Sequence, residues 1–381
     1  METSELITII STGEDSRTQF KSNIQNVDSL AAELVAFSNS GGGRIFIGVS
    51  DNGTISGLNI DDIGRLNQLI SNAASQSVHP PINPLTENIP HPDGIILVIT
   101  VPAGISIPYM DNKAAIWVKN GGDKRKVTSR EEMQRMFQGG GLVHADEIPI
   151  QGLTVADIDL PYFKEFFNKK YEEEFDKQPL ALPELLKNMN LADDYNLKLA
   201  GALLFAKQPN FYLPSFIVKA VCYPGLTIDA EHYIDSRDIT GKMADVFYQS
   251  LSFVINNLKF KQDDNTINST GKPEIPRIVL EELIANALIH RNYFITAHIR
   301  LFVFRNRIEI ITPGNLPNNL TIDNIKSGNS NMRNPVLASF AASLLPYRGI
   351  GSGIIRALKE YPNIDFIDDR DANMFKVIIY R

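Results

Sequence analysis

The stretch that decides the fold of the C-terminal part reads Glu281-Glu-Leu-Ile-Ala-Asn-Ala-Leu-Ile-His-Arg-Asn-Tyr293. Its polar residues Glu282, Asn286 and His290 recur at every fourth position, so they lie along one face of a helix. Leu, Ile and Ala fill most other positions, which indicates a helix packed inside the protein. Polar groups in such a row need partners. The stretch alone fits either a helix that caps a neighbour or a ligand site.

The residue types on this face suit a phosphate bound through a metal ion. An Asn carbonyl oxygen is a hard ligand for Mg²⁺, which also keeps waters and phosphate oxygens around it. A Glu one turn earlier can hold and polarise a water near a terminal phosphate. Asn286 is therefore the candidate Mg²⁺ ligand, and Glu282 is the candidate catalytic residue.

Two glycine segments follow this helix. A predicted strand at 307–311 runs into Thr312-Pro-Gly314, where glycine permits a positive φ. Further on, Gly349-Ile-Gly-Ser-Gly353 precedes a helix predicted at 354–361. Alternating glycines before a helix let backbone N–H groups approach phosphates. Their spacing is GxGxG, whereas dinucleotide folds use GxGxxG. Taken singly, these segments also fit a strand end and a flexible linker.

The order of these segments resembles the GHKL-type ATP-binding domain of gyrase, histidine kinases and MutL, a Bergerat α/β sandwich. The helix, the stretch 312–317 and Arg333-Asn334-Pro335 also resemble a family of bacterial transcriptional regulators with such a module. The resemblance implies that Asn286 holds Mg²⁺ and that Glu282 activates water for ATP hydrolysis. The nucleotide-binding set is Asn286, His290, Thr312, Gly314, Arg333, Gly349, Gly351 and Gly353. The wider superfamily has an Asp where Thr312 stands, and a hydroxyl accepts a hydrogen bond less strongly.

A second set of motifs lies at 14–21, 36–53 and 116–122. In this order they resemble the Schlafen AlbA-like domain over about residues 10 to 137. That domain is linked to nucleic-acid binding and, in some relatives, to RNA cleavage at a site of three carboxylates. Glu14 would be the first carboxylate, but Gln19 stands where the second is expected. Because an amide weakens a two-metal site, we do not expect nuclease activity.

Four cations surround a predicted glycine turn in this domain, with Trp117 nearby: Lys119, Lys124, Arg125 and Lys126. Cations contact phosphates, and an aromatic ring can stack on a base. These residues are therefore the candidate nucleic-acid-binding set. The alternative is a solvated hairpin whose tryptophan belongs to the core.

Periodicity predicts an α/β (α+β) protein with a mixed N-terminal sheet. Predicted helices include 29–39, 129–137, 241–258 and 276–290, and 196–205 is expected to begin as a helix. Predicted strands include 44–49, 95–101, 216–223 and 375–380. The expected division is an AlbA-like domain at 1–140, a mostly helical joining segment with a strand at 141–272, and a GHKL-type module at 273–381.

The composition limits where the protein acts. The 381 residues include one cysteine, so no intramolecular disulfide forms. No apolar run approaches the length of a membrane span, and the N-terminus lacks the pattern of a signal peptide. These features predict a cytoplasmic protein that does not bind membranes. A net charge of −7 means that nucleic acid must bind through a local basic patch.

The sequence therefore predicts an ATP-binding regulator that contacts DNA or RNA and in which Mg·ATP gates the N-terminal domain. GHKL proteins often work as dimers, so a homo-oligomer is expected. One alternative is an enzyme, either a slow ATP hydrolase or a residual metal-dependent nuclease. Another is a non-enzymatic interaction protein whose nucleotide site has decayed.

Overall fold

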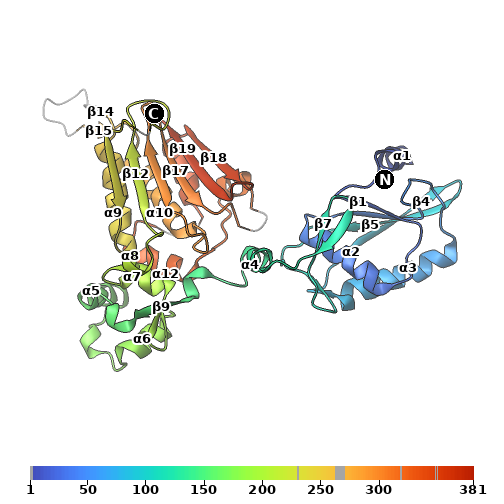
Figure 1. Cartoon of the computed structure of the whole chain (residues 1–381), viewed down its shortest axis with the longest axis horizontal. Helices are drawn as coiled ribbons and strands as arrows, with labels where there is room; N and C mark the ends of the chain where they lie inside the picture. The colour runs from blue at the N-terminus through green and yellow to red at the C-terminus, as the bar shows by residue number, and fades with distance from the viewer. Residues whose placement is uncertain (1–2, 230, 262–270, 318–319, 348, 350) are drawn as a thin grey trace. The chain divides into compact units, whose positions relative to one another are not determined.

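The structure of the chain is a computed structural model that describes residues 3–229, 231–261, 271–317, 320–347, 349 and 351–381. It divides into two compact units, Met1–Val143 and His144–Arg381 (Figure 1). Each unit builds its own sheet and its own core. Among the described residues, no helix combines the length and apolar character that crossing a membrane requires.

The first unit is built on a four-stranded sheet with the order β1-β2-β5-β4. Strands β1 (Thr18–Lys21) and β2 (Gly43–Ile47) are parallel. Strands β5 (Gly94–Val101) and β4 (Leu85–His91) extend the sheet with antiparallel pairing. The sheet is therefore mixed, as predicted.

Helices cover both faces of this sheet. Side chains alternate along β2, so Ile45 and Ile47 enter one core while Phe46 enters the other. Helices α2 (Val27–Asn39) and α3 (Ile60–Asn72) pack on the first face, and a π-helical turn, Ala73–Ser77, continues α3. Helix α1 (Thr3–Thr12), which was not predicted, buries Leu6 on the second face.

The remaining elements of this unit form small pairs. Strand β3 (Val78–His79) pairs with β6 (Met110–Asp111), and β7 (Trp117–Asn120) forms a hairpin with β8 (Asp123–Lys126). Helix α4 (Arg130–Gly139) follows. The Oγ of Ser129 accepts a hydrogen bond from the Glu132 backbone N–H at 3.3 Å, so the predicted N-cap is confirmed.

The second unit contains a six-stranded sheet with the order β13-β12-β16-β17-β19-β18. Strands β12 and β16 are parallel, and every other neighbouring pair is antiparallel. The strands are β12 (Val218–Cys222), β13 (Asp235–Ile239), β16 (Ile299–Val303), β17 (Arg307–Pro313), β18 (Ile364–Asp369) and β19 (Met374–Tyr380).

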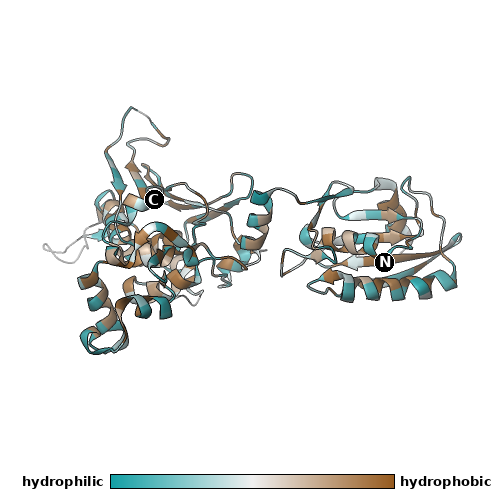
Figure 2. Ribbon diagram, turned by 60° about the horizontal axis from the view of Figure 1, so that its bottom comes forward, coloured by the Kyte–Doolittle hydropathy of each residue, from teal (hydrophilic) through white to brown (hydrophobic). Residues whose placement is uncertain are grey.

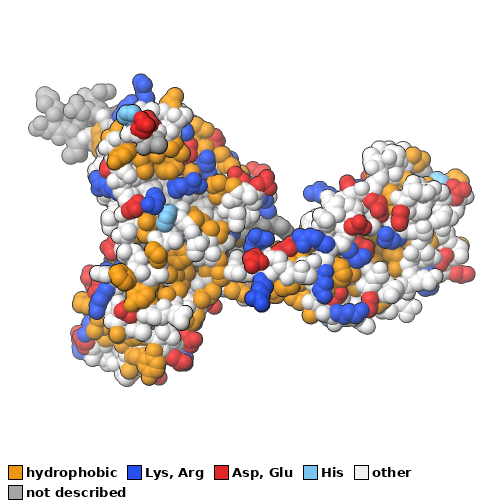
Figure 3. Space-filling view, in the orientation of Figure 1, with side chains coloured by type: hydrophobic (Ala, Val, Ile, Leu, Met, Phe, Trp, Pro, Cys, Tyr) orange, Lys and Arg blue, Asp and Glu red, His pale blue; other side chains and the backbone are white. Residues whose placement is uncertain are grey.

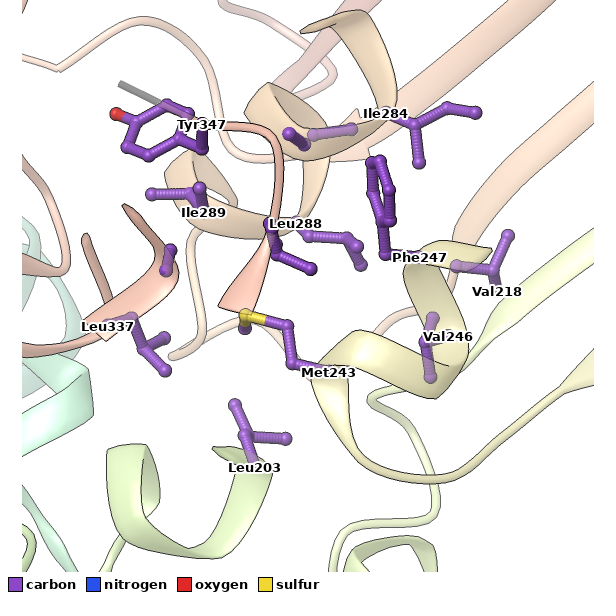
Figure 4. Packing of buried hydrophobic residues seen from close by; sticks show 14 of the residues in the cluster. Leu203, Val218, Met243, Val246, Phe247, Ile284, Leu288, Ile289, Leu337 and Tyr347 are labelled. Atoms are coloured by element: carbon purple, nitrogen blue, oxygen red, sulfur yellow. The ribbon is translucent and has the colours of Figure 1, made fainter. Parts of the chain in front are cut away.

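The core of this unit lies between the sheet and the helices α9 (Met243–Asn256) and α10 (Arg277–His290). Figure 4 shows Phe247 of α9 beside Ile284 and Leu288 of α10. Fully burying one such side chain contributes roughly 1.5 to 3 kcal/mol. Figure 2 shows that the helices carry hydrophilic residues as well as hydrophobic ones, as helices with one solvent-exposed face do.

The segment before α9 adds a small three-stranded sheet with the order β10-β11-β9. Its strands are β9 (Pro149–Thr154), β10 (Ala192–Asp193) and β11 (Asn196–Lys198). Its helices are α5 (Leu160–Tyr171), α6 (Leu182–Asn188), α7 (Leu199–Phe205) and α8 (Pro209–Tyr212). The other elements of the unit are α11 (Ile322–Lys326), α12 (Pro335–Leu344), α13 (Gly353–Glu360), β14 (Phe260–Lys261) and β15 (Lys272–Pro273).

The predicted fold class, α/β with mixed sheets, is confirmed. One local prediction was wrong: the stretch 196–205 begins as strand β11, because Asn196 and Leu197 pair with β10 across a tight turn. The predicted last strand is present as β19. It lies inside the sheet, since the unpredicted β18 takes the edge beside it. The predicted joining segment and the predicted module contribute strands to one sheet and share one core.

Candidate functional site

A cavity opens where α10, the end of β17 and the start of α13 meet. Most leucines and isoleucines of helix α10 belong to the core, and the polar row predicted from the sequence lines the cavity together with Leu283. The lining includes most of the predicted set, namely Glu282, Asn286, His290, Thr312, Gly314, Gly349, Gly351 and Gly353. The structure therefore brings together residues that are up to 71 positions apart in sequence, from 282 to 353.

Glu282 is the buried acid of this cavity, with 6% of its surface exposed. Its Oε1 accepts a hydrogen bond from the Asn286 Nδ2 at 3.2 Å. Its Oε2 accepts one from the Arg356 guanidinium at 2.8 Å, which also forms an ion pair. Both carboxylate oxygens are thus bonded, and the Asn286 carbonyl oxygen has no hydrogen-bond partner among the described residues.

Arg356 was not predicted as a site residue. It is the fourth residue of α13, directly after the glycine run. A cation near the start of a helix is locally unfavourable, because the dipole there favours anions. The Glu282 carboxylate compensates the Arg356 charge at this position, and this partner cannot be identified from sequence alone.

The glycines of the cavity allow close approach of backbone and side chains. A Cβ on Gly353 would lie 1.5 Å from the Glu282 Oε1, so any larger residue would displace the carboxylate or the helix. Gly351 has a φ of +73°, and a Cβ there would lie 2.1 Å from the Gly328 carbonyl oxygen. The glycine run therefore packs tightly against both α10 and the loop after α11. Arg348 and Ile350 of the same run lie outside the described residues.

His290 lies at the C-terminal end of the polar row. Its Nε2 is 3.2 Å from the Tyr347 hydroxyl. Burial, together with the nearby Arg333 cation, lowers the pKa of His290 to about 4. The imidazole is therefore neutral at pH 7 and adds no positive charge to the cavity.

Arg333 lies behind the cavity wall. Its guanidinium donates to the Asn315 carbonyl at 2.7 Å and to the His290 carbonyl at 3.4 Å. A Cβ on Gly314 would lie 2.6 Å from the Arg333 Nη1, so the glycine makes room for this side chain. Arg333 therefore holds the glycine turn against the end of α10.

The neighbouring Asn334 caps the C-terminus of α10. It is 1% exposed, and its Nδ2 donates to the carbonyls of Ile289 and Arg291 at 2.8 and 2.9 Å. Arg291 is also buried and donates to the carbonyls of Ile295 and Ala297. These two residues of the sequence motifs thus stabilise the chain path next to the cavity.

The opposite wall of the cavity is mostly apolar. It includes the side chains of Leu316, Ile325, Phe366 and Val377, and Leu283 of α10 adds a further apolar side chain to the lining. Thr312 lies at this wall with 5% of its surface exposed, and no described residue hydrogen-bonds to its Oγ1. An apolar wall with a few polar groups is typical of sites that hold a planar organic ring.

The predicted nucleic-acid-binding cations differ in burial and in the number of internal partners that they bond. Lys119 is half-buried, donates to the Gly122 carbonyl at 2.6 Å and lies over the Phe37 ring. Burial lowers the pKa of Lys119, although the charges of Glu33 and Glu14 act in the opposite direction. Both Lys119 and Gln19 thus belong to an internal network, because the Lys119 ammonium also donates to the Gln19 side chain.

Of the other three cations, all on β8, Lys124 is partly buried, whereas Arg125 and Lys126 are exposed. Lys124 pairs with the buried Glu33 at 2.6 Å. Arg125 is exposed and forms a bidentate pair with Glu132 at 2.6 and 2.9 Å. Lys126 is exposed and has no partner among the described residues. Figure 3 shows Lys and Arg side chains, mixed with acidic ones, around this hairpin and α4.

Two further residues of the N-terminal motifs have internal partners. The Trp117 indole N–H donates to the Asp111 Oδ2 at 2.8 Å, and the ring is half-buried. The Gln19 Nε2 donates to the Glu14 Oε1 at 3.0 Å. Within the described ranges, no group of three or more His, Cys, Asp or Glu residues is placed to hold a metal ion.

Comparison with known families places two matches on the chain. Residues 14–128 match a family described as "Schlafen, AlbA_2". Residues 296–378 match HATPase_c_4, described as "Putative ATP-dependent DNA helicase recG C-terminal". The chain thus has an N-terminal domain of the Schlafen AlbA_2 kind, as predicted, and an ATPase-like C-terminal domain. The second match begins after α10, so Glu282, Asn286 and His290 lie outside it.

Two solved structures are similar to the chain. The DIP2311 protein from Corynebacterium diphtheriae is 20% identical with a TM-score of 0.47, and the match covers 99% of this chain and 79% of that one. The N-terminal domain of a RecG-related protein from Nitrosomonas europaea is 18% identical with a TM-score of 0.24, and the match covers 34% of this chain and 97% of that one. No curated protein matches the chain.

Proposed function

We propose that the protein binds Mg·ATP in the cavity between α10 and α13, and that the bound nucleotide gates nucleic-acid contact by the N-terminal domain. The observation that carries this proposal is the convergence of Glu282, Asn286 and the glycines before α13 on one cavity. In this proposal the C-terminal domain is a GHKL-type module with a Bergerat fold, and the protein acts as a transcriptional regulator.

The donor set fits a magnesium ion. The Asn286 amide nitrogen donates to Glu282, which leaves the harder carbonyl oxygen for a cation. Mg²⁺ supplies charge neutralisation between phosphate oxygens, and Asn286 would be its protein ligand. Gly349, Gly351 and Gly353 would hold the phosphates through backbone N–H groups at the start of α13.

The apolar wall fits an adenine ring. Thr312 Oγ1 is the free acceptor on this wall and would receive the adenine amino group directly or through water. A hydroxyl carries no charge, so adenine should be favoured over guanine less strongly than by a carboxylate. Neutral His290 would leave the electrostatics of the phosphate end to the metal and Arg356.

A short route for gating runs through hydrogen bonds made by the residues that directly follow the N-terminal unit. His144, the first residue of the second unit, lies with its Nδ1 3.1 Å from the Arg333 carbonyl oxygen. The Asp146 carboxylate accepts a hydrogen bond from the Leu337 N–H at 2.9 Å. The residues that directly follow the N-terminal unit are therefore bonded to the segment that holds the glycine turn of the cavity. A nucleotide that shifts Arg333 would pull on the connection between the units.

Nucleic-acid contact is proposed for the outer part of the hairpin. The Lys126 side chain is free among the described residues, and the exposed Arg125 can exchange its partly buried partner Glu132 for a phosphate. Lys119 and Lys124 would support the hairpin from inside. DNA and RNA share the phosphate chemistry that these cations recognise. A homo-oligomer stays part of the proposal and is checked by light scattering with and without Mg·ATP.

Titration calorimetry with Mg·ATP tests the proposal. Wild type should bind, and Asn286→Ala should bind at least about tenfold more weakly, because the metal loses its protein ligand. Asn256→Ala is the matched control, since Asn256 is an exposed residue at the end of α9. Absence of binding by wild type would leave the alternative of an interaction protein with a decayed nucleotide site.

A second candidate function, slow ATP hydrolysis, is favoured by one observation. Glu282 lies in the cavity one helical turn from Asn286, within reach of a water beside the terminal phosphate. Single-turnover hydrolysis should then fall by about 100-fold or more in Glu282→Gln. Equal rates in wild type and variant would remove the catalytic role of Glu282 while leaving nucleotide binding intact.

A further inference from the structure

We propose that Arg356 reads the terminal phosphate of the nucleotide by exchanging the Glu282 carboxylate for it. The ion pair seen here is then the resting state of a sensor that separates a nucleoside triphosphate from a diphosphate. This inference rests on the proposed nucleotide site and adds the residue that makes it specific for the triphosphate.

The ion pair crosses the cavity between two helices. Arg356 on α13 donates from Nη2 to the Glu282 Oε2 at 2.8 Å, while Asn286 donates to the other oxygen. The exposed fraction of the side chain is 31% for Arg356 and 7% for Glu282. Since the arginine is the more exposed partner, its guanidinium can leave the pair by a side-chain rotation while the carboxylate stays in place.

Glu282 occupies the position that a phosphate would need. The missing Cβ of Gly353 brings the carboxylate directly over the first residue of α13. The start of a helix favours negative charge, and here a protein carboxylate takes that place. An incoming terminal phosphate therefore meets a carboxylate and its arginine at the same point.

Arg356 is the one Lys or Arg that lines the cavity within the described ranges. His290 is neutral at pH 7, and the guanidinium of Arg333 is bonded to backbone carbonyls behind the wall. A triphosphate carries more charge into the cavity than a diphosphate does. Arg356 is thus the described side chain able to compensate that difference, and the metal at Asn286 compensates the charge that both nucleotides share.

The exchange has opposite consequences for the two partners. Removing the Arg356 charge takes away a charge-assisted bond to the terminal phosphate, so triphosphate affinity falls more than diphosphate affinity. Replacing Glu282 by Gln frees the arginine and removes the repulsion of the carboxylate, so triphosphate affinity rises. If the ion pair were purely structural, a substitution of either partner would lower the affinities for Mg·ATP and Mg·ADP equally.

The experiment compares the affinities of the full chain for Mg·ATP and Mg·ADP by calorimetry. The variants are Arg356→Met, Arg356→Lys, Glu282→Gln and the double variant Glu282→Gln/Arg356→Met, which avoids an unpaired buried carboxylate. Lys359→Met is the matched control, because it removes a cation from the exposed face of the same helix. Thermal unfolding of each variant confirms that it is folded.

We expect wild type to prefer Mg·ATP by about tenfold, which is the worth of one charge-assisted hydrogen bond. The preference should vanish in Arg356→Met and in the double variant, recover in part in Arg356→Lys, rise in Glu282→Gln and stay unchanged in Lys359→Met. Unchanged preference in the folded double variant would overturn the inference while leaving the nucleotide site standing. Binding of neither nucleotide by wild type would overturn both.

Discussion

Two buried glutamates, one in each unit of the molecule, pair with a cation that is distant in sequence. Glu33 pairs with Lys124 at 2.6 Å, and Glu282 pairs with Arg356 at 2.8 Å. The glutamate side chains are equally buried, each 7% exposed. The two pairs therefore share the same chemistry, and only their surroundings separate them.

The surroundings show what turns a buried ion pair into a candidate site. The second oxygen of Glu33 is buried and has no hydrogen-bond partner in the part of the chain that the structure describes, and the nearby Lys119 ammonium is bonded to the hairpin backbone. Both oxygens of Glu282 are bonded, and the carboxylate faces a cavity with a free Asn286 carbonyl and a glycine run. The first pair fastens a hairpin to α2, whereas we propose that the second exchanges partners with a ligand.

Breaking the fastening pair should have the largest effect on stability. Glu33→Ala leaves Lys124 without its partner in a half-buried position, and losing one partner of such a pair costs about 3 kcal/mol. Denaturant unfolding of the full chain, followed by signals from the first unit, measures this loss. Glu131→Ala, an exposed acid on α4, is the control; a loss no larger than in that control would show that the pair fastens nothing.

Filling the space beside the Glu282–Arg356 pair should lower the free energy of unfolding somewhat less. Gly353→Ala puts a Cβ 1.5 Å from the Glu282 Oε1, and overpacking of this kind destabilises by about 2 kcal/mol. Mg·ATP binding should be lost with it. Gly64→Ala on α3 meets open space and should instead stabilise by up to about 1 kcal/mol. Equal melting temperatures for Gly353→Ala and wild type would contradict the close contact.

Asp146 is a buried carboxylate with no Lys or Arg ion-pair partner among the described residues, so it tests how much a cation contributes. Burial raises its pKa from 3.8 to about 6, although the Leu337 N–H acts in the opposite direction. The native state holds its proton up to a higher pH than the unfolded chain does, so stability falls as pH rises from 3.8 through about 6. Relative to Asp146→Asn, wild type should lose about 1 to 2 kcal/mol between about pH 5 and pH 7.5.

Chemical denaturation across that pH range measures the difference between Asp146→Asn and wild type. A difference that is constant with pH would show that Asp146 titrates as an ordinary carboxyl.

The smallest expected effect is on nucleic-acid binding, and it distinguishes the exposed Lys126 from Lys124, which pairs with Glu33. Lys126→Ala should lower the slope of log affinity for nucleic acid against log salt by about one, because one phosphate contact is lost. Lys124→Ala should leave that slope unchanged and lower stability instead, since Lys124 is committed to Glu33. Fluorescence anisotropy with a labelled oligonucleotide measures both slopes, and equal slopes for Lys126→Ala and wild type would remove the hairpin from the interface.

Local patterns of the sequence predicted much of the fold. The i, i+4, i+8 spacing of Glu282, Asn286 and His290 predicted a helix with one polar face, and all three line one cavity. The roles of these three residues in nucleotide binding and hydrolysis remain predictions. Strand β18 was missed although Ile364 and Phe366 alternate with Asp365, which is the signal of a half-buried strand.

Partners far apart in sequence could not be predicted. Arg356 follows Glu282 by 74 residues, and Lys124 follows Glu33 by 91. No helical or strand period links residues at such distances. For this reason, the basic cluster around the β7–β8 turn was predicted to be a binding surface, although Lys119 and Lys124 belong to an internal network.

The most direct test of the central claim is a crystal structure of the full chain with Mg²⁺ and a non-hydrolysable ATP analogue. The account predicts the metal on the Asn286 carbonyl oxygen, the phosphates on the backbone of Gly349, Gly351 and Gly353, and the Arg356 guanidinium moved from Glu282 to the terminal phosphate. A nucleotide bound elsewhere would contradict the site. A nucleotide in the cavity with the Arg356–Glu282 pair intact would contradict the exchange.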